Sequence, residues 1–233
     1  MICVFSMLRN LSGQFLMMIK FEQISKRYPG GFEALSQVDF ILETGEMAFL
    51  TGHSGAGKTT MLKLIAKLQS PFTGQLIVNG VHLNNLKRNE IAHYRSQLGI
   101  IFQSPNLLGD RSVFDNVALP LQIQGFSHVM IPKRVRAALD MVGLLNKEKM
   151  SPAQLSAGEQ QRVGIARAVV HKPALVLADE PTGNLDPTLS TDIMKLFQQF
   201  NQVGVSILIA THDLALIAGM KHRIVMLKKG RIC

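Results

Sequence analysis

The chain has 233 residues, of which 47% are hydrophobic and 18% charged, and its formal net charge is +9. The composition excludes a disordered chain, and the length allows one domain, or one domain with a sizeable subdomain. No segment has the roughly 18 uninterrupted apolar residues of a membrane span, while the positive charge favours contact with nucleic acid, a nucleotide or an anionic membrane surface.

Features near the two ends of the sequence bear on its compartment. Cys3 and Cys233 lie far apart in the sequence, so they indicate neither a disulfide framework nor a clustered metal site. A reducing cytoplasm is the simpler inference.

Residues 1–17 are apolar, but their single Arg9 follows the first apolar run, and no A-x-A-like cleavage site is present. We therefore expect residues 1–17 to be a poorly packed extension and Met18 to be an alternative start.

The expected elements alternate between strands and helices along the chain. Strands are predicted over residues 19–28, 33–45, 47–52, 74–80, 98–103, 174–179, 206–212 and 223–232. Helices are predicted over residues 58–69 and 159–171, before the final strand, and in a region from about 112 to 145 that Pro120, Gly125 and Pro132 divide. This order predicts an α/β core with an inserted helical subdomain.

A glycine-rich loop joins the third predicted strand to the helix that follows it. The segment "GHSGAGKT", residues 52–59, matches G-x-x-x-x-G-K-[ST] in the strand-to-helix context that a phosphate-binding P-loop requires. Its glycines allow backbone N–H groups to surround phosphate oxygens, Lys58 would reach the β- and γ-phosphates, and the Thr59 hydroxyl would hold Mg²⁺. The residues expected to contact the nucleotide here are Gly52, His53, Ser54, Gly55, Ala56, Gly57, Lys58, Thr59 and Thr60.

Two carboxylates follow the apolar strand "ALVLAD" and suggest hydrolysis. Asp179 at the strand end is placed to hold Mg²⁺, and the adjacent Glu180 could polarise an attacking water as a general base. Gln103, at the end of another strand, could touch Mg²⁺ or that water, and His212 ends the strand "SILIATH" at the edge where open α/β sheets bind ligands. Tyr28 precedes a turn and could stack on an adenine, although a half-buried turn tyrosine is the commoner role.

A second turn of small and polar residues, "LSAGEQQRV", occupies residues 155–163. Ser156 followed by Glu159 is a capping box, which predicts that a helix begins there with unpaired N–H groups pointing outward. A helix start containing Gly158 can bind an anion, but a well-capped helix with no ligand explains the same residues.

The order of these motifs resembles the nucleotide-binding domain of ABC ATPases. The resemblance rests on the P-loop, Gln103, the LSxGxQ-like turn, the Asp-Glu strand end, the Asn184-Leu185-Asp186 segment and His212, and it covers residues 18–233. It implies a P-loop NTPase with a RecA-like core sheet, an antiparallel β subdomain and a helical subdomain at about residues 104–158. It also implies ATP and Mg²⁺ as ligands.

The resemblance further implies that two copies pack head to tail, so that each completes the ATP site of the other. Ser156 and Gly158 would contact the γ-phosphate bound by the partner copy, and Asp186 would cross the interface. Gln103 would be the Q-loop residue, His212 the switch histidine and Tyr28 the adenine-stacking aromatic. Ala157 stands where the family usually has glycine; we expect it to be tolerated, because a capping-box first turn has ordinary helical φ.

Four stretches are similar to the FtsE branch of the family, the bacterial cell-division ATPases: residues 45–65, 114–121, 155–186 and 204–217. The resemblance implies a membrane partner, FtsX, that would bind residues 104–121 and carry the ATP cycle to the control of septal peptidoglycan hydrolysis. It implies a peripheral location on the cytoplasmic face of the inner membrane. The "DEPTGNLD" stretch is shared with lipoprotein-release and efflux ATPases, which are the nearest alternative.

Two further classes fit less well. DNA-repair ABC ATPases carry long coiled-coil or zinc-bearing insertions between the P-loop and the signature turn, and this chain has neither, so no nucleic acid is expected. A non-hydrolysing scaffold would lack Glu180 or His212, and both are present. We therefore expect slow, Mg²⁺-dependent ATP hydrolysis.

Overall fold

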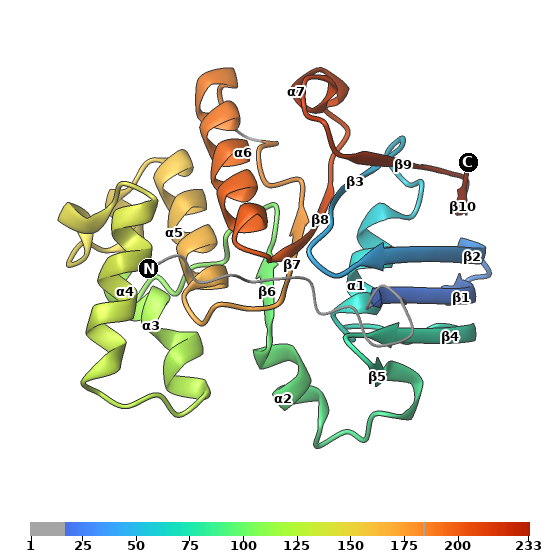
Figure 1. The fold of residues 1–233 in the computed structure, drawn as a ribbon, viewed down its shortest axis with the longest axis horizontal. Helices are drawn as coiled ribbons and strands as arrows, with labels where there is room; N and C mark the ends of the chain where they lie inside the picture. Colours follow the sequence, from blue (N-terminus) through green and yellow to red (C-terminus); the bar gives the residue numbers. More distant parts are fainter. Residues whose placement is uncertain (1–16, 184) are drawn as a thin grey trace, which may run out of the picture.

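Two sheets and a group of helices make up the part of the chain that the computed structural model describes, residues 17–183 and 185–233 (Figure 1). The smaller sheet is antiparallel, with strand order β2-β1-β4-β5. Its strands are β1 (Met17–Arg27), β2 (Glu33–Glu43), β4 (Thr73–Val78) and β5 (Val81–His82). Of the extension expected over residues 1–17, only Met17 lies within the described residues, as the first residue of β1.

The larger sheet is parallel except at one edge and has the order β10-β9-β3-β8-β7-β6. Its strands are β3 (Met47–Thr51), β6 (Leu98–Ile101), β7 (Leu175–Asp179), β8 (Ser206–Ala210), β9 (Arg223–Lys228) and β10 (Arg231–Ile232). Because β3, β7 and β8 run in the same direction, their carboxyl ends reach one edge of the sheet, where α/β proteins bind ligands.

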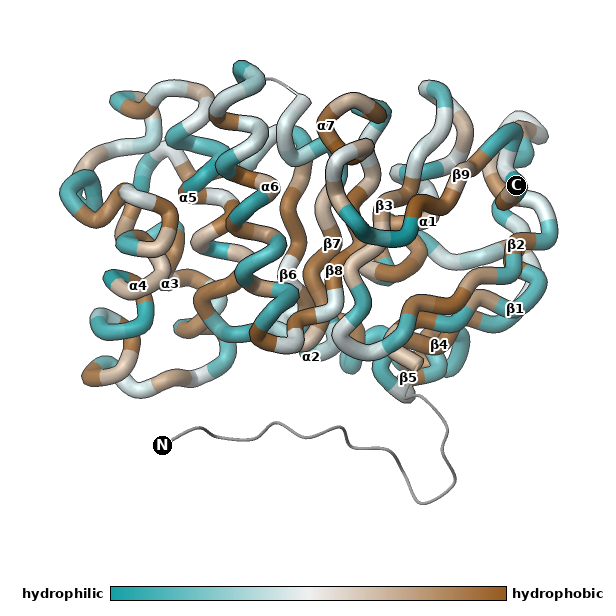
Figure 2. Tube along the Cα trace, turned by 45° about the horizontal axis from the view of Figure 1, so that its top comes forward, coloured by the Kyte–Doolittle hydropathy of each residue, from teal (hydrophilic) through white to brown (hydrophobic). Residues whose placement is uncertain are grey.

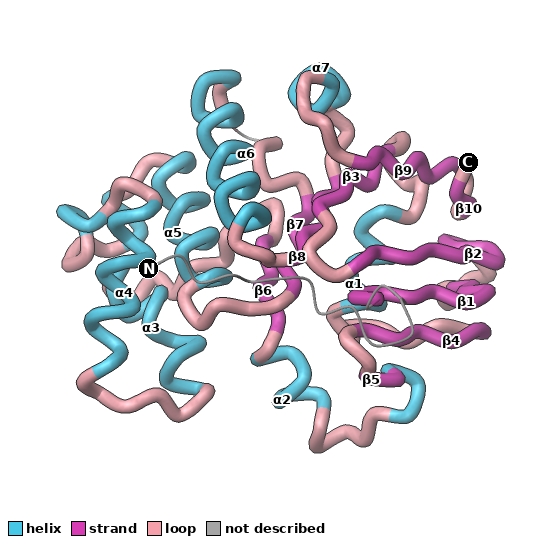
Figure 3. The backbone as a smooth tube through the Cα atoms, in the orientation of Figure 1, coloured by secondary structure: helices cyan, strands magenta, loops and turns pink. Residues whose placement is uncertain are grey.

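Some helices follow strands of the larger sheet, and others form a layer of their own (Figures 1 and 3). Helix α1 (Lys58–Ile65) follows β3, and α6 (Pro187–Gln202) and α7 (Leu214–Ala218) belong to the C-terminal half. The short helix α2 (Ile91–Ser96) precedes β6. Helices α3 (Val113–Ile123), α4 (Met130–Met141) and α5 (Ala157–Val169) form a separate layer, with 3₁₀ turns η1 (Leu83–Asn85), η2 (Leu145–Lys147) and η3 (Pro152–Gln154) in the connections. None of the helices in the described residues combines the length and apolar character of a membrane span.

Both faces of the larger sheet are buried, which explains the continuous apolar runs of its central strands (Figure 2). On β3, Phe49 packs into a core with the helical layer, whereas Ala48 and Leu50 face a second core beneath the antiparallel sheet. Strands β7 and β8 alternate in the same way between the two cores. The fold class expected from the sequence, a P-loop core with an antiparallel subdomain and added helices, is confirmed.

Three local expectations were incomplete or wrong. Pro120 and Pro132 do not divide the helical region. Pro120 lies inside α3, which continues to Ile123 because Val117 and Leu121 on either side of it are fully buried. Pro132 lies in the first turn of α4, where a helix tolerates proline. The break falls at Gly125, whose φ of 74° only glycine adopts without strain.

The predicted last strand is in fact a hairpin, since β9 and β10 pair antiparallel around Lys229 and Gly230, both with positive φ. Helix α2 and strand β5 were not predicted.

Candidate functional site

The P-loop leaves the carboxyl end of β3 and enters α1 through three glycines in conformations that side chains rarely adopt. Gly52, Gly55 and Gly57 have φ of 144°, 77° and 111°. A Cβ on Gly52 would lie 2.2 Å from the carbonyl oxygen of Leu227, and one on Gly57 would lie 2.6 Å from that of Ala34. Glycine is therefore required both for the turn and for the close approach of neighbouring strands.

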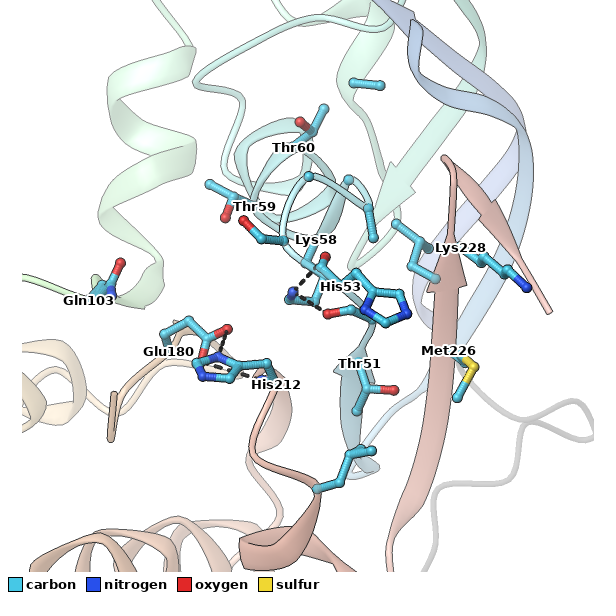
Figure 4. Close-up of a pocket in the computed structure, with 18 of the residues that line it drawn as sticks. Thr51, His53, Lys58, Thr59, Thr60, Gln103, Glu180, His212, Met226 and Lys228 are labelled. Carbon is cyan, nitrogen blue, oxygen red and sulfur yellow. Dashed lines mark hydrogen bonds and ion pairs between the residues drawn. The ribbon is translucent and has the colours of Figure 1, made fainter. Parts of the chain in front are cut away.

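Lys58 begins α1, and its side chain folds over the loop. The residue is 7% exposed, and Nζ donates to the carbonyl oxygens of Gly52 at 2.6 Å and His53 at 3.3 Å (Figure 4). The loop borders a cavity of about 800 Å³, which Gln103, Glu180 and His212 also line. A buried ammonium group beside a glycine loop and a helix start makes this cavity suited to a polyanionic ligand.

Asp179, the last residue of β7, lies within hydrogen-bonding reach of Thr59. Burial raises the pKa of Asp179, and the nearby Glu180 raises it further, while the hydrogen bond from Thr59 acts in the opposite direction. One carboxylate oxygen, Oδ1, is buried without a hydrogen-bond partner. A partly desolvated carboxylate with an unpaired oxygen beside a threonine hydroxyl fits the oxygen-ligand chemistry of Mg²⁺.

Glu180 and His212 follow the carboxyl ends of the adjacent strands β7 and β8 and face each other (Figure 4). Nδ1 of His212 lies 2.9 Å from Oε1 of Glu180, and the backbone N–H of His212 donates to Oε2 at 3.4 Å. The Glu180 side chain is 14% exposed, whereas that of His212 is 69% exposed toward the cavity. Glu180 also has a positive φ of 46°, a strained conformation that the hydrogen bond from its N–H to the Ala210 carbonyl helps to hold.

Two aromatic residues lie at or beside this cavity. The hydroxyl groups of Tyr28 and Thr60 share a hydrogen bond of 3.2 Å, which places Tyr28 next to the loop. Phe32 lines the cavity and is 61% exposed, but sequence reasoning did not select it. The signal that could have found Phe32 is an aromatic residue directly after the Pro29–Gly31 turn, four residues beyond the selected tyrosine.

The signature turn has the predicted local structure. Ser156 caps α5 by accepting from the Glu159 N–H at 3.3 Å, and Glu159 returns the bond by accepting from the Ser156 N–H at 3.0 Å. Lys147 Nζ donates to Oε1 of Glu159 at 2.5 Å, and this hydrogen bond is the main cause of a lowered Glu159 pKa. Ala157 has no positive φ, as expected.

The signature turn does not reach the P-loop cavity of its own chain. Neither Ser156 nor Gly158 lines that cavity, and α5 lies in the helical layer on the other side of the larger sheet from α1 (Figure 1). Gly158 is buried against α6, where a Cβ would lie 2.2 Å from Cδ2 of Leu189. Asp186 caps α6 by accepting from the Leu189 N–H at 3.0 Å and is likewise outside the cavity. Asn184, part of the same motif, lies outside the described residues.

Comparisons with known proteins agree with this arrangement. Residues 35–183 match the family model described as ABC transporter. The chain is 56% identical over 215 residues to the cell division ATP-binding protein FtsE of Escherichia coli strain K12, covering 92% of this chain and 97% of that protein. It is 41% identical to FtsE of Bacillus subtilis strain 168, covering 92% and 94%.

Solved structures show the same fold. A dimeric bacterial ABC transporter cassette superimposes with a TM-score of 0.86 and 34% identity, over 92% of this chain and 96% of that one. The same values hold for a dimeric post-hydrolysis state of an ATP-binding cassette bound to ADP and Pi. The chain therefore belongs to the ABC transporter family and, within it, to the family of the cell division ATP-binding protein FtsE.

Proposed function

We propose that this chain binds and hydrolyses ATP as half of a head-to-tail dimer, and that it drives a membrane partner in bacterial cell division. The observation that carries the proposal is that the motifs lie at two separate places on the chain's surface. The P-loop, Gln103, Glu180 and His212 border one cavity, while Ser156 and Gly158 face elsewhere. A second copy would supply the missing side of the cavity.

In this proposal the P-loop binds the phosphates and Lys58 moves from the loop carbonyls to the β- and γ-phosphates. Exchange of the two neutral carbonyl acceptors for anionic phosphate oxygens pairs the ammonium with an opposite charge, so the attraction of an ion pair is added to hydrogen bonds that the charged donor already strengthens. Tyr28 stacks on the adenine beside the loop. Phe32, exposed at the same cavity, offers a further apolar surface for the base.

Thr59, Asp179 and Gln103 are the residues that would hold Mg²⁺. Bound there, the ion would neutralise charge on the β- and γ-phosphate oxygens. The unpaired Oδ1 of Asp179 supports this role, because a buried carboxylate oxygen without a partner is otherwise costly.

Glu180 acts as the general base and His212 as the group that positions it. Both Glu180 oxygens contact His212, one through the ring and one through the backbone N–H. These bonds fix the carboxylate at the cavity wall, where it can accept a proton from water attacking the γ-phosphate. The exposed ring of His212 can then contact the phosphate itself.

The dimer follows from the position of the signature turn. Ser156 and the N–H groups at the start of α5 would contact the γ-phosphate bound by the partner copy, and Asp186 would cross the same interface. The dimeric state of the two solved cassettes supports this assembly.

The membrane partner in this proposal is FtsX, through which the ATP cycle controls septal peptidoglycan hydrolysis. The 56% identity to a cell division ATP-binding protein supports this choice over the related lipoprotein-release and efflux ATPases. Residues 104–121, which lead from Gln103 into α3, are the expected docking surface. The chain would then lie on the cytoplasmic face of the inner membrane.

Glu180→Gln tests the proposal because it removes the base but keeps the size of the side chain. The variant should bind ATP, hydrolyse it about 100-fold to 10,000-fold more slowly, and accumulate as an ATP-bound dimer in light scattering. Normal turnover would show that Glu180 is not the base. Copurification with a lipoprotein-release permease in place of FtsX would contradict the cell-division assignment while leaving the ATPase chemistry intact.

A further inference from the structure

The connection between α3 and α4 exposes an unusual amount of apolar surface. We use the name tip segment for residues 122–134, which span this connection at the outer edge of the helical layer (Figure 1). Within it Val129 is 73% exposed, Ile123 66% and Met130 44%. Three large apolar side chains exposed within eight residues form a patch that differs from singly scattered surface residues, and such patches mark interaction sites.

The same segment carries positive charge and no acidic residue. Its sequence, "QIQGFSHVMIPKR", contains Lys133 and Arg134, together with His128, but neither Asp nor Glu. Lys133 is exposed, and no ion pair within the described residues involves it. The local charge has the same sign as the net charge of +9. An apolar patch with cations beside it matches the surface of an anionic membrane, where apolar groups enter the acyl region and cations meet lipid phosphates.

The tip segment is held in a defined shape. Phe126 packs against the core of the helical layer, and the Arg134 guanidinium lies 4.6 Å from the centre of its ring. The Gln124 side-chain amide donates to the Ser96 carbonyl at the end of α2. These contacts hold Phe126, Arg134 and Gln124 against the rest of the protein. Ile123, Val129 and Met130 remain exposed, so the segment that carries these apolar side chains has a fixed conformation.

We propose that the tip segment is a lipid-contact site that binds the surface of an anionic membrane. This inference goes beyond the proposed function, because it gives the chain a membrane contact of its own in addition to a protein partner. The site is separate from the ATPase chemistry, since no tip residue lines the P-loop cavity. The absence of acidic residues and the position of the exposed Lys133, three residues after Met130 on α4, favour an anionic lipid surface over a zwitterionic surface or a purely apolar partner.

Val129→Trp gives a direct readout, because the chain has no tryptophan of its own. The purified full chain carrying this substitution is mixed with vesicles of phosphatidylcholine, with and without phosphatidylglycerol. We expect its fluorescence to shift to shorter wavelength and to be quenched by brominated lipid only when phosphatidylglycerol is present. Val203→Trp is the matched control, because Val203 is 79% exposed after α6 and lies outside the tip segment. Its emission should not change.

Flotation with the same vesicles measures each contribution. Lys133→Gln should weaken binding about fivefold, whereas the same change at exposed Lys221 should have a smaller effect. Ile123→Ser with Val129→Ser should weaken binding about tenfold or more and leave the ATPase rate unchanged.

Three results would overturn the proposal: no binding of the wild-type chain to anionic vesicles, equal effects of the Lys133 and Lys221 substitutions, or an unshifted Val129→Trp spectrum in bound protein. A spectrum that responds to polyglutamate but not to vesicles would assign the patch to an acidic protein instead.

Discussion

One methyl group added at Gly158, the second residue of α5, should weaken the ATP-dependent dimer much more than it weakens the fold. A Cβ there would lie 2.2 Å from Cδ2 of Leu189 and 3.5 Å from Cδ2 of Leu185. The Leu189 methyl is the far end of a flexible side chain, and moving it to a less favourable rotamer costs about 0.5–1.5 kcal/mol. Gly to Ala in a helix gains about 1 kcal/mol. The two effects nearly cancel, so the free energy of unfolding of Gly158→Ala should stay within about 1 kcal/mol of wild type.

ATP-dependent dimerisation of Gly158→Ala should respond differently. The methyl group points toward Leu189 on α6, so it would push the start of α5 and the start of α6 apart and move the N–H groups of the signature turn away from the γ-phosphate of the partner site. Loss of a backbone hydrogen bond to a charged group costs about 1.5–3 kcal/mol, so dimer formation in ATP should weaken about 10-fold to 100-fold. Urea unfolding measures the stability, and light scattering of the protein in a Glu180→Gln background measures the dimer.

Leu189→Ala supplies the decisive comparison, because it makes room for the new methyl group without changing the backbone of α5. Gly158→Ala combined with Leu189→Ala should regain dimerisation. A double variant as defective as Gly158→Ala would refute the reasoning, since it would show that the methyl group does not act by displacing α5 from α6. Ala157→Gly, at a position with ordinary helical φ, should change stability by no more than about 1 kcal/mol.

Two other residues give independent predictions. Lys58→Ala removes the ammonium group of the P-loop and should weaken ATP binding about 10-fold to 100-fold; titration with a fluorescent ATP analogue measures this, and an unchanged affinity would contradict a phosphate contact. Glu159→Gln removes a carboxylate whose pKa is lowered, chiefly by the hydrogen bond from Lys147. Because the folded-state pKa is below the ordinary value, the stabilisation is complete above that ordinary value and is lost as the pH falls through the folded pKa. The variant should therefore be about 1 kcal/mol less stable at neutral pH, and urea unfolding should show the gap closing in acid; a gap that does not change with pH would exclude an electrostatic cause.

Local spacing made much of the fold predictable. The P-loop, the capping box at Ser156 and the apolar strands each depend on neighbouring residues, so they could be recognised without tertiary information. The continuity of α3 through Pro120 could not, because burial of Val117 and Leu121 outweighs the local cost of proline. The β9–β10 turn was missed because Lys229 adopts a positive φ, and lysine is not a residue type that predicts this conformation.

The candidate site was predictable where residues end strands of the parallel sheet. Asp179 and His212 follow apolar runs, and parallel strands bring such positions to one edge. The strained φ of Glu180 and the exposure of Phe32 toward the cavity depend on how distant segments meet, so no local pattern contains them. That the signature turn faces away from its own P-loop is likewise a property of the assembled fold.

The central claim, that each ATP site is built from two copies, is tested most directly by mixing two inactive variants. Lys58→Ala disables the P-loop, and Ser156→Asp places a negative charge at the expected γ-phosphate contact while keeping α5 capped, because Asp caps helices as well as Ser. Neither variant should hydrolyse ATP alone. Their equimolar mixture should recover about a quarter of the wild-type rate, because half of randomly formed two-fold dimers are mixed and each mixed dimer holds one intact site. A mixture as inactive as its parents would contradict the shared site.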